Sequence, residues 1–178
     1  YTTFQSAMAG GEQVVNLLDT SVEIDDAPGA VPLPPVKGEI KLTNVSFKYR
    51  AELPDVLHRV NLHIPAGTTA ALVGPTGAGK TTIANLIARF YEVSEGSITI
   101  DGYDIREITT ASLHQQVRVI GQDPFLFSRT IAENIKYGKP GASDDEMILA
   151  AQQANANGFI ERLPDGYQTR VLEGGVNL

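Results

Sequence analysis

The chain has no cysteine among its 178 residues. Disulfide scaffolds, thiolate catalysis and zinc sites built on cysteine are therefore excluded. Basic residues are also scarce, because 14 Lys and Arg stand against 21 Asp and Glu and the net charge is −7. Since no basic block stands apart from this acidic background, we expect no nucleic-acid partner. Long apolar runs are missing as well, and none approaches the ~20 residues that a membrane-spanning helix needs.

What is present is an ordinary globular composition. Hydrophobic residues make up 42% of the chain and charged residues 20%, which disfavours wholesale disorder. The length suits one domain with its own core. The chain begins at Tyr1 and stops at Leu178 without a polar tail or a helix cap, so we expect it to be a piece of a longer protein.

The composition changes twice along the chain. Residues 1–24 begin with an apolar stripe at helical spacing, which predicts an amphipathic helix over the first eighteen residues. Residues 25–38 hold four prolines and predict an extended linker, which at about 3.1 Å per residue would span roughly 40 Å. Residues 39–178 then alternate between strand and helix patterns and form the domain proper.

Within that domain the patterns predict five strands and three helices. The predicted strands are 40–49, with an irregularity near Asn44, and 60–64, 69–73, 98–100 and 117–120. The run at 69–73 is nearly continuous in apolar residues, which is typical of a strand buried on both faces. The predicted helices are 80–90, 109–116 and 143–153, the last opened by a capping box from Ser143 to Glu146.

One motif carries most of the functional information. It reads Gly74-Pro75-Thr76-Gly77-Ala78-Gly79-Lys80-Thr81 and matches the phosphate-binding P-loop pattern in full. The motif follows a predicted buried strand and precedes a predicted helix, as its mechanism requires.

The chemistry of this loop follows from its residue types. The three glycines allow backbone conformations closed to other residues, so that successive N–H groups converge on phosphate oxygens. The next helix adds unpaired N–H groups and its positive dipole end. We expect Lys80 at the β- and γ-phosphates, Thr81 on Mg²⁺ and Thr82 on the next phosphate inward. The motif predicts a nucleoside triphosphate but not which one.

Other segments, in order and spacing, resemble a known family. They are Val45–Tyr49, the P-loop, Ile120–Phe127, Ile131–Ile135, Leu163–Tyr167 and Glu173–Leu178. Together they resemble the nucleotide-binding domain of exporter-type ATP-binding cassette (ABC) transporters over about residues 38–178. Residues 1–24 resemble, more weakly, the end of the last membrane helix and its cytoplasmic extension. The resemblance implies an α/β P-loop NTPase fold of ABC type, with an antiparallel β subdomain, a parallel core and the start of a helical subdomain, incomplete at the C-terminus.

The resemblance also implies roles for single residues, with ATP and Mg²⁺ as cofactors. Tyr49 matches the aromatic residue that stacks on adenine, and a strand-edge aromatic is the alternative from its pattern alone. Gln122 matches a glutamine that contacts Mg²⁺ or the attacking water and links the nucleotide to the membrane domain; alternatively it caps a strand end. Lys80 and Gln122 are thus the catalytic candidates, and Thr81 and Gln122 the metal ligands.

The implied partners are a second nucleotide-binding domain, identical or different, and coupling helices of a membrane domain. Those helices would meet Gln122, Phe125, Leu126, Phe127 and the loop 169–175, in which Leu172 replaces a glycine of the family pattern. The implied place is the cytoplasmic face of a membrane, where ATP binding and hydrolysis drive transport of an unknown substrate. The family's Walker B aspartate, glutamate base, signature and switch histidine do not occur in these residues, so we expect the chain alone to bind Mg-ATP weakly or not at all and not to turn it over.

Two alternatives use the same motif. One is a soluble ABC-type ATPase of DNA repair or translation, which the acidic charge, the proline-rich linker and the N-terminal helix disfavour. The other is a scaffold that binds nucleotide without hydrolysing it. The three histidines offer no partners at metal-ligand spacing.

Overall fold

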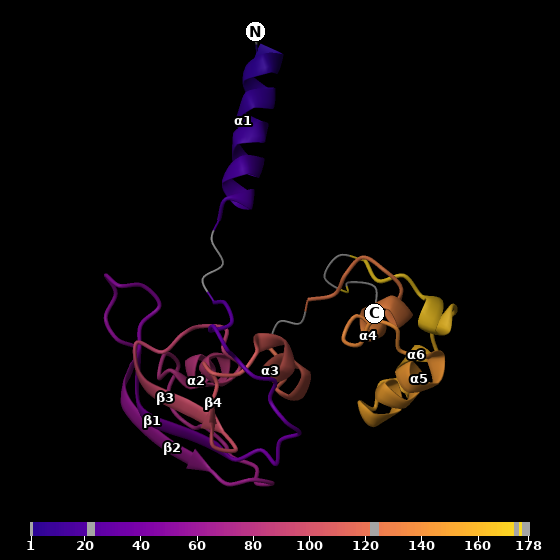
Figure 1. The fold of residues 1–178 in the computed structure, drawn as a ribbon. Coiled ribbons are helices and arrows are strands. Elements are labelled where there is room, and N and C mark those ends of the chain that lie inside the picture. Colours follow the sequence, from indigo (N-terminus) through magenta and orange to yellow (C-terminus); the bar gives the residue numbers. More distant parts are fainter. Residues whose placement is uncertain (1, 21–23, 122–124, 173–174, 176–178) are drawn as a thin grey trace. The chain divides into compact units, whose positions relative to one another are not determined.

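A computed structural model describes residues 2–20, 24–121, 125–172 and 175. The chain divides into two compact units, residues 1–119 and 120–178, and each is described by itself (Figure 1). Over the described residues, no helix has both the length and the apolar character that crossing a bilayer demands.

The N-terminal helix predicted from the apolar stripe is confirmed as α1, Thr2–Leu18. It carries no acidic residue in its first turn and no basic residue in its last turn. Val14, Val15 and Leu18 of the stripe are exposed.

A four-stranded antiparallel sheet, in the order β2-β1-β3-β4, is the centre of the first unit. Its strands are β1 Ile40–Phe47, β2 Leu57–Ile64, β3 Glu95–Ile100 and β4 Tyr103–Asp104. The strands predicted at 40–49, 60–64 and 98–100 are therefore confirmed.

The irregularity predicted near Asn44 is also confirmed. The pairing of β1 with β2 shifts between Leu42 and Val45, and Asn44 has a left-handed φ of 49°. Opposite this bulge a Cβ on Gly96 would lie 2.4 Å from backbone oxygens, so only glycine fits. After the bulge the chain buries Val45 and Phe47, and β1 ends two residues before Tyr49.

Two strand predictions are wrong. Residues 69–73 and 117–120 carry no strand in the structure. Val73 is 92% exposed and Ile120 is 95% exposed, although 69–73 was predicted as a strand buried on both faces and 117–120 as a strand. A buried strand needs hydrogen-bonded neighbours along its edges. In the described parts of the chain neither segment pairs with a strand, and the sheet is antiparallel throughout.

Two helices complete the first unit, α2 Lys80–Ile87 and α3 Thr110–Gln116. The core contains Ile83 and Leu86 of α2 and Leu113 of α3, packed with the buried side chains of the sheet. Helix α2 ends before the predicted residue 90 because the chain turns into a left-handed conformation at Arg89, with φ 54°.

The second unit is helical, with α4 Ile131–Lys136, α5 Asp144–Gln153, α6 Asn157–Ile160 and the short 3₁₀ helix η1 Gly166–Gln168. The capping box from Ser143 to Glu146 is confirmed at the start of α5. A second capping box, from Thr130 to Glu133, opens α4 and was not predicted. These caps satisfy N–H groups that a helix start otherwise leaves free.

Candidate nucleotide-binding site

The P-loop lies between the exposed segment 69–73 and the start of α2. Gly77 and Gly79 have left-handed φ values of 85° and 83°, and the Ala78 N–H donates to the Pro75 carbonyl at 3.2 Å. This supports the predicted need for glycine at two of the three positions. Gly74 differs from the prediction, because its φ lies outside the left-handed region.

Gly79 is constrained twice. It is the N-cap of α2, and a Cβ at this position would lie 2.6 Å from the Cδ2 of Leu57 at the start of β2. The backbone therefore passes directly against the sheet at the residue where the helix begins. Glycine is required here both by conformation and by space.

The start of α2 has the features of an anion-binding helix end. No side chain caps it, and no acidic residue lies in its first turn. The first N–H groups of a helix lack intrahelical acceptors, and the helix dipole makes this end positive. A phosphate group is the kind of ligand that satisfies both conditions.

Lys80, the first residue of α2, folds its side chain back over the loop. Its Nζ donates to the carbonyl oxygens of Gly74, at 2.9 Å, and Pro75, at 2.7 Å. The ammonium therefore lies against the loop that carries the converging amides. Weak carbonyl partners of this kind are readily exchanged for charged phosphate oxygens, which form stronger hydrogen bonds with an ammonium.

Helix α2 also fixes the position of Tyr49. The Tyr49 hydroxyl lies 2.9 Å from the Oγ1 of Thr82, which is buried, whereas Thr81 is exposed. Tyr49 itself is 41% exposed. The residues predicted to meet the base and the phosphates thus lie at the same end of one helix.

Two further aromatic rings support Tyr49. Phe47 meets it edge-on at 4.9 Å between ring centroids, and Tyr91 does so at 5.1 Å. No sequence pattern points to Tyr91, because its place beside Tyr49 depends on the left-handed turn at Arg89 that follows α2. These two contacts hold the ring in place, while 41% of Tyr49 remains exposed.

The donors of this site fit the phosphate tail of a nucleotide: glycine-enabled amides, an uncapped helix start and one ammonium. For Mg²⁺ the described candidate is the Thr81 hydroxyl, and Gln122 lies outside the described residues. No cluster of three or more His, Asp and Glu side chains able to hold a metal occurs in the described ranges. Mg²⁺ takes six oxygen ligands and accepts phosphate oxygens and waters among them.

The predicted coupling surface belongs to the second unit. Phe125 is 78% exposed and packs edge-on against Phe127 at 5.0 Å, while Leu126 and Phe127 are partly buried. Leu126 contacts the core formed by Ile131, Ala151, Ile160 and Val171. Only Phe125 of the predicted patch is fully exposed.

The loop 169–175 is held at one end. The N–H of Val171 donates to the Arg129 carbonyl at 2.8 Å, and Thr130 and Arg170 form an isolated β-bridge. The Thr169 Oγ1 is buried and has no hydrogen-bond partner. Leu172, which stands where the family pattern has glycine, is exposed and has no left-handed φ. Residues 173 and 174 lie outside the described residues.

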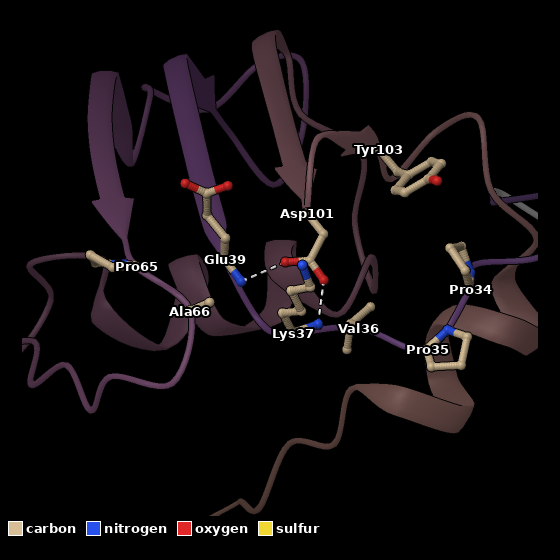
Figure 2. A pocket seen from close by; sticks show the side chains of 9 residues that line it. All are labelled: Pro34, Pro35, Val36, Lys37, Glu39, Pro65, Ala66, Asp101 and Tyr103. Carbon is tan, nitrogen blue, oxygen red and sulfur yellow. Dashed lines mark hydrogen bonds between the residues drawn. The ribbon is translucent and has the colours of Figure 1, made fainter.

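A cavity of about 550 Å³ lies elsewhere, between the segment 34–37, Glu39, Pro65–Ala66, Asp101 and Tyr103 (Figure 2). No P-loop residue lines it. A phosphate tail is bound by an open cradle of amides rather than by an enclosed pocket. The chemistry therefore indicates the loop as the site.

These features define the class of the molecule as a P-loop nucleotide-binding protein. Comparison with known proteins is more specific, because the ABC transporter family profile matches residues 57–176. The chain therefore belongs to the ABC transporter family, and it has that family's P-loop NTPase fold. Domains of this family bind ATP, generally with Mg²⁺.

Individual relatives agree with this assignment. An ATP-dependent lipid A-core flippase of Desulfotalea psychrophila is 46% identical over 177 residues, covering 99% of this chain and 31% of the relative. An uncharacterized ABC transporter ATP-binding protein of Bacillus subtilis, YfiC, is 48% identical over 175 residues, covering 98% of this chain and 29% of the relative. The structure of a bacterial Atm1-family ABC exporter with ATP bound matches all of this chain and 31% of its own, with a TM-score of 0.86 and 41% identity. The chain thus spans about a third of the length of these proteins.

Proposed function

We propose that this chain is the ATP-binding part of an ABC exporter, in which ATP binding and hydrolysis drive transport across a membrane. The observation that carries the proposal is the P-loop arrangement, in which Gly77 and Gly79 are left-handed and Lys80 folds over the loop. The relatives named as a flippase and an ABC exporter support transport as the outcome. In this proposal the domain works at the cytoplasmic face of a membrane.

Each described residue has a defined task in this proposal. The amides of the loop and the start of α2 bind the phosphate oxygens of ATP. Lys80 exchanges its two carbonyl partners for β- and γ-phosphate oxygens and so neutralises charge that grows as the terminal phosphate departs. Thr81 offers its hydroxyl to Mg²⁺, which would neutralise further phosphate charge, and Tyr49 stacks on adenine.

The proposed partners follow the same logic. A second nucleotide-binding domain, identical or different, would close over the exposed P-loop face. A membrane domain would meet Gln122, the exposed ring of Phe125 with Leu126 and Phe127, and the loop 169–175. Contiguous exposed apolar groups mark contact surfaces, and the exposed ring of Phe125 packs against the partly exposed Phe127.

The experiment that tests the proposal compares Lys80→Ala with Lys41→Ala in the full-length protein. Lys41 is an exposed lysine of β1 and serves as the matched control. We expect Lys80→Ala to lower ATP turnover by about 100-fold or more, because it removes a charge that stabilises the transition state. Lys41→Ala should leave turnover unchanged. Equal turnover in both variants would refute the proposal, and binding without turnover in the unchanged protein would instead favour a nucleotide-binding scaffold.

We also propose that residues 1–178 alone do not hydrolyse ATP, because the catalytic glutamate and signature implied by the family resemblance are not among them. The test is an ATPase assay on this chain. Turnover that disappears with Lys80→Ala would overturn this part.

A further inference from the structure

Arg89 is a buried charge that the proposed ATP chemistry does not use. It is 4% exposed, and it is the only charged side chain among the buried ones in the described parts of the chain. A buried charge is tolerated only when it is paired and hydrogen-bonded. Its partners therefore show what this residue is for.

Three separate segments supply those partners. The Nε donates to the Glu92 carboxylate at 2.8 Å, Nη1 to the Ile108 carbonyl at 3.3 Å and Nη2 to the Asp25 carbonyl at 3.1 Å. Glu92 follows α2, Ile108 precedes α3, and Asp25 is the first residue of the proline-rich segment. The planar guanidinium joins all three because its five donors point in fixed, divergent directions.

The backbone conformation at Arg89 also indicates that its side chain has a specific role. Arg89 has a left-handed φ of 54°, the Arg89 N–H donates to the Leu86 carbonyl, and the Phe90 N–H donates to the Asn85 carbonyl. This is the helix-ending turn in which glycine is usual. Arginine here accepts backbone strain that glycine would avoid, so the position is set by the side chain.

Residues 25–38, named here the strap, are docked along the first unit. At their start the Asp26 carboxylate accepts hydrogen bonds from the N–H and the Oγ1 of Thr110, the first residue of α3. In their middle the Val31 N–H donates to the Glu107 carbonyl at 3.0 Å, and the Thr109 N–H donates to the Val31 carbonyl at 2.9 Å.

Helix α3 holds the next part of the strap. The Leu33 N–H donates to the Ser112 Oγ at 2.8 Å. The Gln116 side chain accepts from the Val36 N–H at 2.8 Å and donates to the carbonyls of Leu33 and Pro34. At the far end the Asp101 carboxylate accepts the N–H groups of Lys37, Gly38 and Glu39, as Figure 2 shows for Lys37 and Glu39.

We propose that Arg89 is a positioning residue that joins the strap to the carboxyl end of the P-loop helix, so that nucleotide binding and strap docking stabilise each other. The inference rests on the proposed function, since it takes ATP as the ligand of Lys80. Helix α2 is about 12 Å long at 1.5 Å per residue and acts as one rigid element between Lys80 and Arg89. Undocking of the strap removes an acceptor from a buried cation and loosens the helix end, and a ligand that orders the helix start opposes this.

Linkage makes this proposal quantitative. If nucleotide binding lowers the equilibrium constant for strap opening by some factor, the docked protein must bind nucleotide more tightly than the undocked protein by the same factor. Such couplings amount to about 5–150-fold. In the sequence the strap lies between the N-terminal helix and the first strand of the sheet. The same link would therefore make the state of the chain next to residues 2–18 depend on whether nucleotide is bound.

The test is amide hydrogen exchange in the strap of the full-length protein, with and without a non-hydrolysable ATP analogue and Mg²⁺. In the unchanged protein we expect the analogue to slow exchange at Val31, Leu33 and Val36 by about fivefold or more. Arg89→Lys keeps the charge but lacks the fork, and Arg89→Gln lacks both. Both variants should speed amide exchange in the strap, and the analogue should no longer slow it. Both should also bind the analogue more weakly, by the factor by which it slows strap exchange in the unchanged protein.

The matched control is Arg106→Gln, since the Arg106 guanidinium hydrogen-bonds to Asp104 rather than to the strap or to α2. It should leave the effect of the analogue intact. The proposal is overturned if the analogue binds the unchanged protein without slowing strap exchange, a result that needs no variant to fold. It is also overturned if Arg89→Lys loosens the strap with no change in analogue affinity. Absence of analogue binding to the unchanged protein would instead refute the proposed function.

Discussion

The P-loop and the strap are both irregular segments of the first unit, but different parts of the chain hold them. The P-loop is closed by bonds within itself, from Ala78 to Pro75 and from Lys80 to Gly74 and Pro75. The strap is held by residues far along the chain, 63 positions away for Gly38 with Asp101 and 84 for Asp26 with Thr110. A local loop keeps its geometry through its own residue types, whereas the strap exists only when α3 and the sheet are in place.

The largest effect expected from this comparison is at Gly79. Gly79→Ala should destabilise the fold by about 2–4 kcal/mol, because it combines a left-handed φ with a Cβ placed 2.6 Å from Leu57. Displacement of the loop should lower ATP turnover by about 100-fold. Thermal unfolding and an ATPase assay on the full-length protein measure the two effects.

Gly77→Ala is the matched control, since its φ is also left-handed but its Cβ would meet no atom within 4 Å. Gly77→Ala should lower the free energy of unfolding by about 1–2 kcal/mol, because only the backbone conformation is strained. Equal effects of the two substitutions would show that contact with β2 does not shape the loop.

The next largest effect is expected at Gln116, which holds the strap against α3. Gln116→Ala removes three hydrogen bonds to the strap, each worth about 0.5–1.5 kcal/mol, and should lower the free energy of unfolding by about 2–3 kcal/mol. Its neighbour Gln115 is exposed, and Gln115→Ala should change this free energy by less than about 0.5 kcal/mol. Denaturant unfolding of both variants tests the difference, and a similar loss in both would refute strap docking through α3.

Acid should release the strap before it affects the P-loop. Hydrogen bonds from the Thr110 hydroxyl and N–H hold the pKa of Asp26 below its ordinary value. The Glu39 N–H, foremost, and the N–H groups of the strap residues Lys37 and Gly38 lower the pKa of Asp101 in the same way. A carboxyl whose pKa is lowered on docking stabilises docking above its undocked pKa. That stabilisation is lost as pH falls through the lower, docked pKa, which places the transition below about pH 4.

Hydrogen exchange at strap amides, corrected for its intrinsic pH dependence, measures this transition. Asp26→Asn with Asp101→Asn should remove the pH dependence. An unaltered acid transition in that double variant would contradict the assignment of these two carboxylates.

The smallest expected effect concerns Tyr49. Tyr49→Phe keeps the ring between Phe47 and Tyr91 but loses the bond to Thr82, so ATP affinity should change by less than about threefold. Tyr49→Ala removes the stacking surface and should make the free energy of ATP binding less favourable by about 1–3 kcal/mol. Titration with a fluorescent ATP analogue distinguishes them, and an equal loss in both would assign the role of Tyr49 to its hydroxyl.

The difference between segments held by neighbouring residues and segments held by distant ones also explains which features the sequence alone predicts. The P-loop and the cap at Ser143 depend mainly on neighbouring residues, and each was predicted from a short pattern. The docked strap was predicted only as an extended linker, because its four prolines say nothing about partners such as Asp101 and Gln116. Arg89 gave no signal, since its burial follows from tertiary contacts.

The errors at 69–73 and 117–120 have the same origin. An apolar run shows that a segment can be a buried strand, but a strand forms only where other strands pair with it. Pairing is a property of distant segments, and these two segments remain without it in the described residues.

A structure of the full-length protein with a bound non-hydrolysable ATP analogue tests the central claim most directly. The account predicts phosphate oxygens against the amides of residues 77–81, with the Lys80 Nζ moved from the carbonyls of Gly74 and Pro75 onto the phosphates. A nucleotide bound at another place in an intact protein, with Lys80 still on those carbonyls, would contradict it.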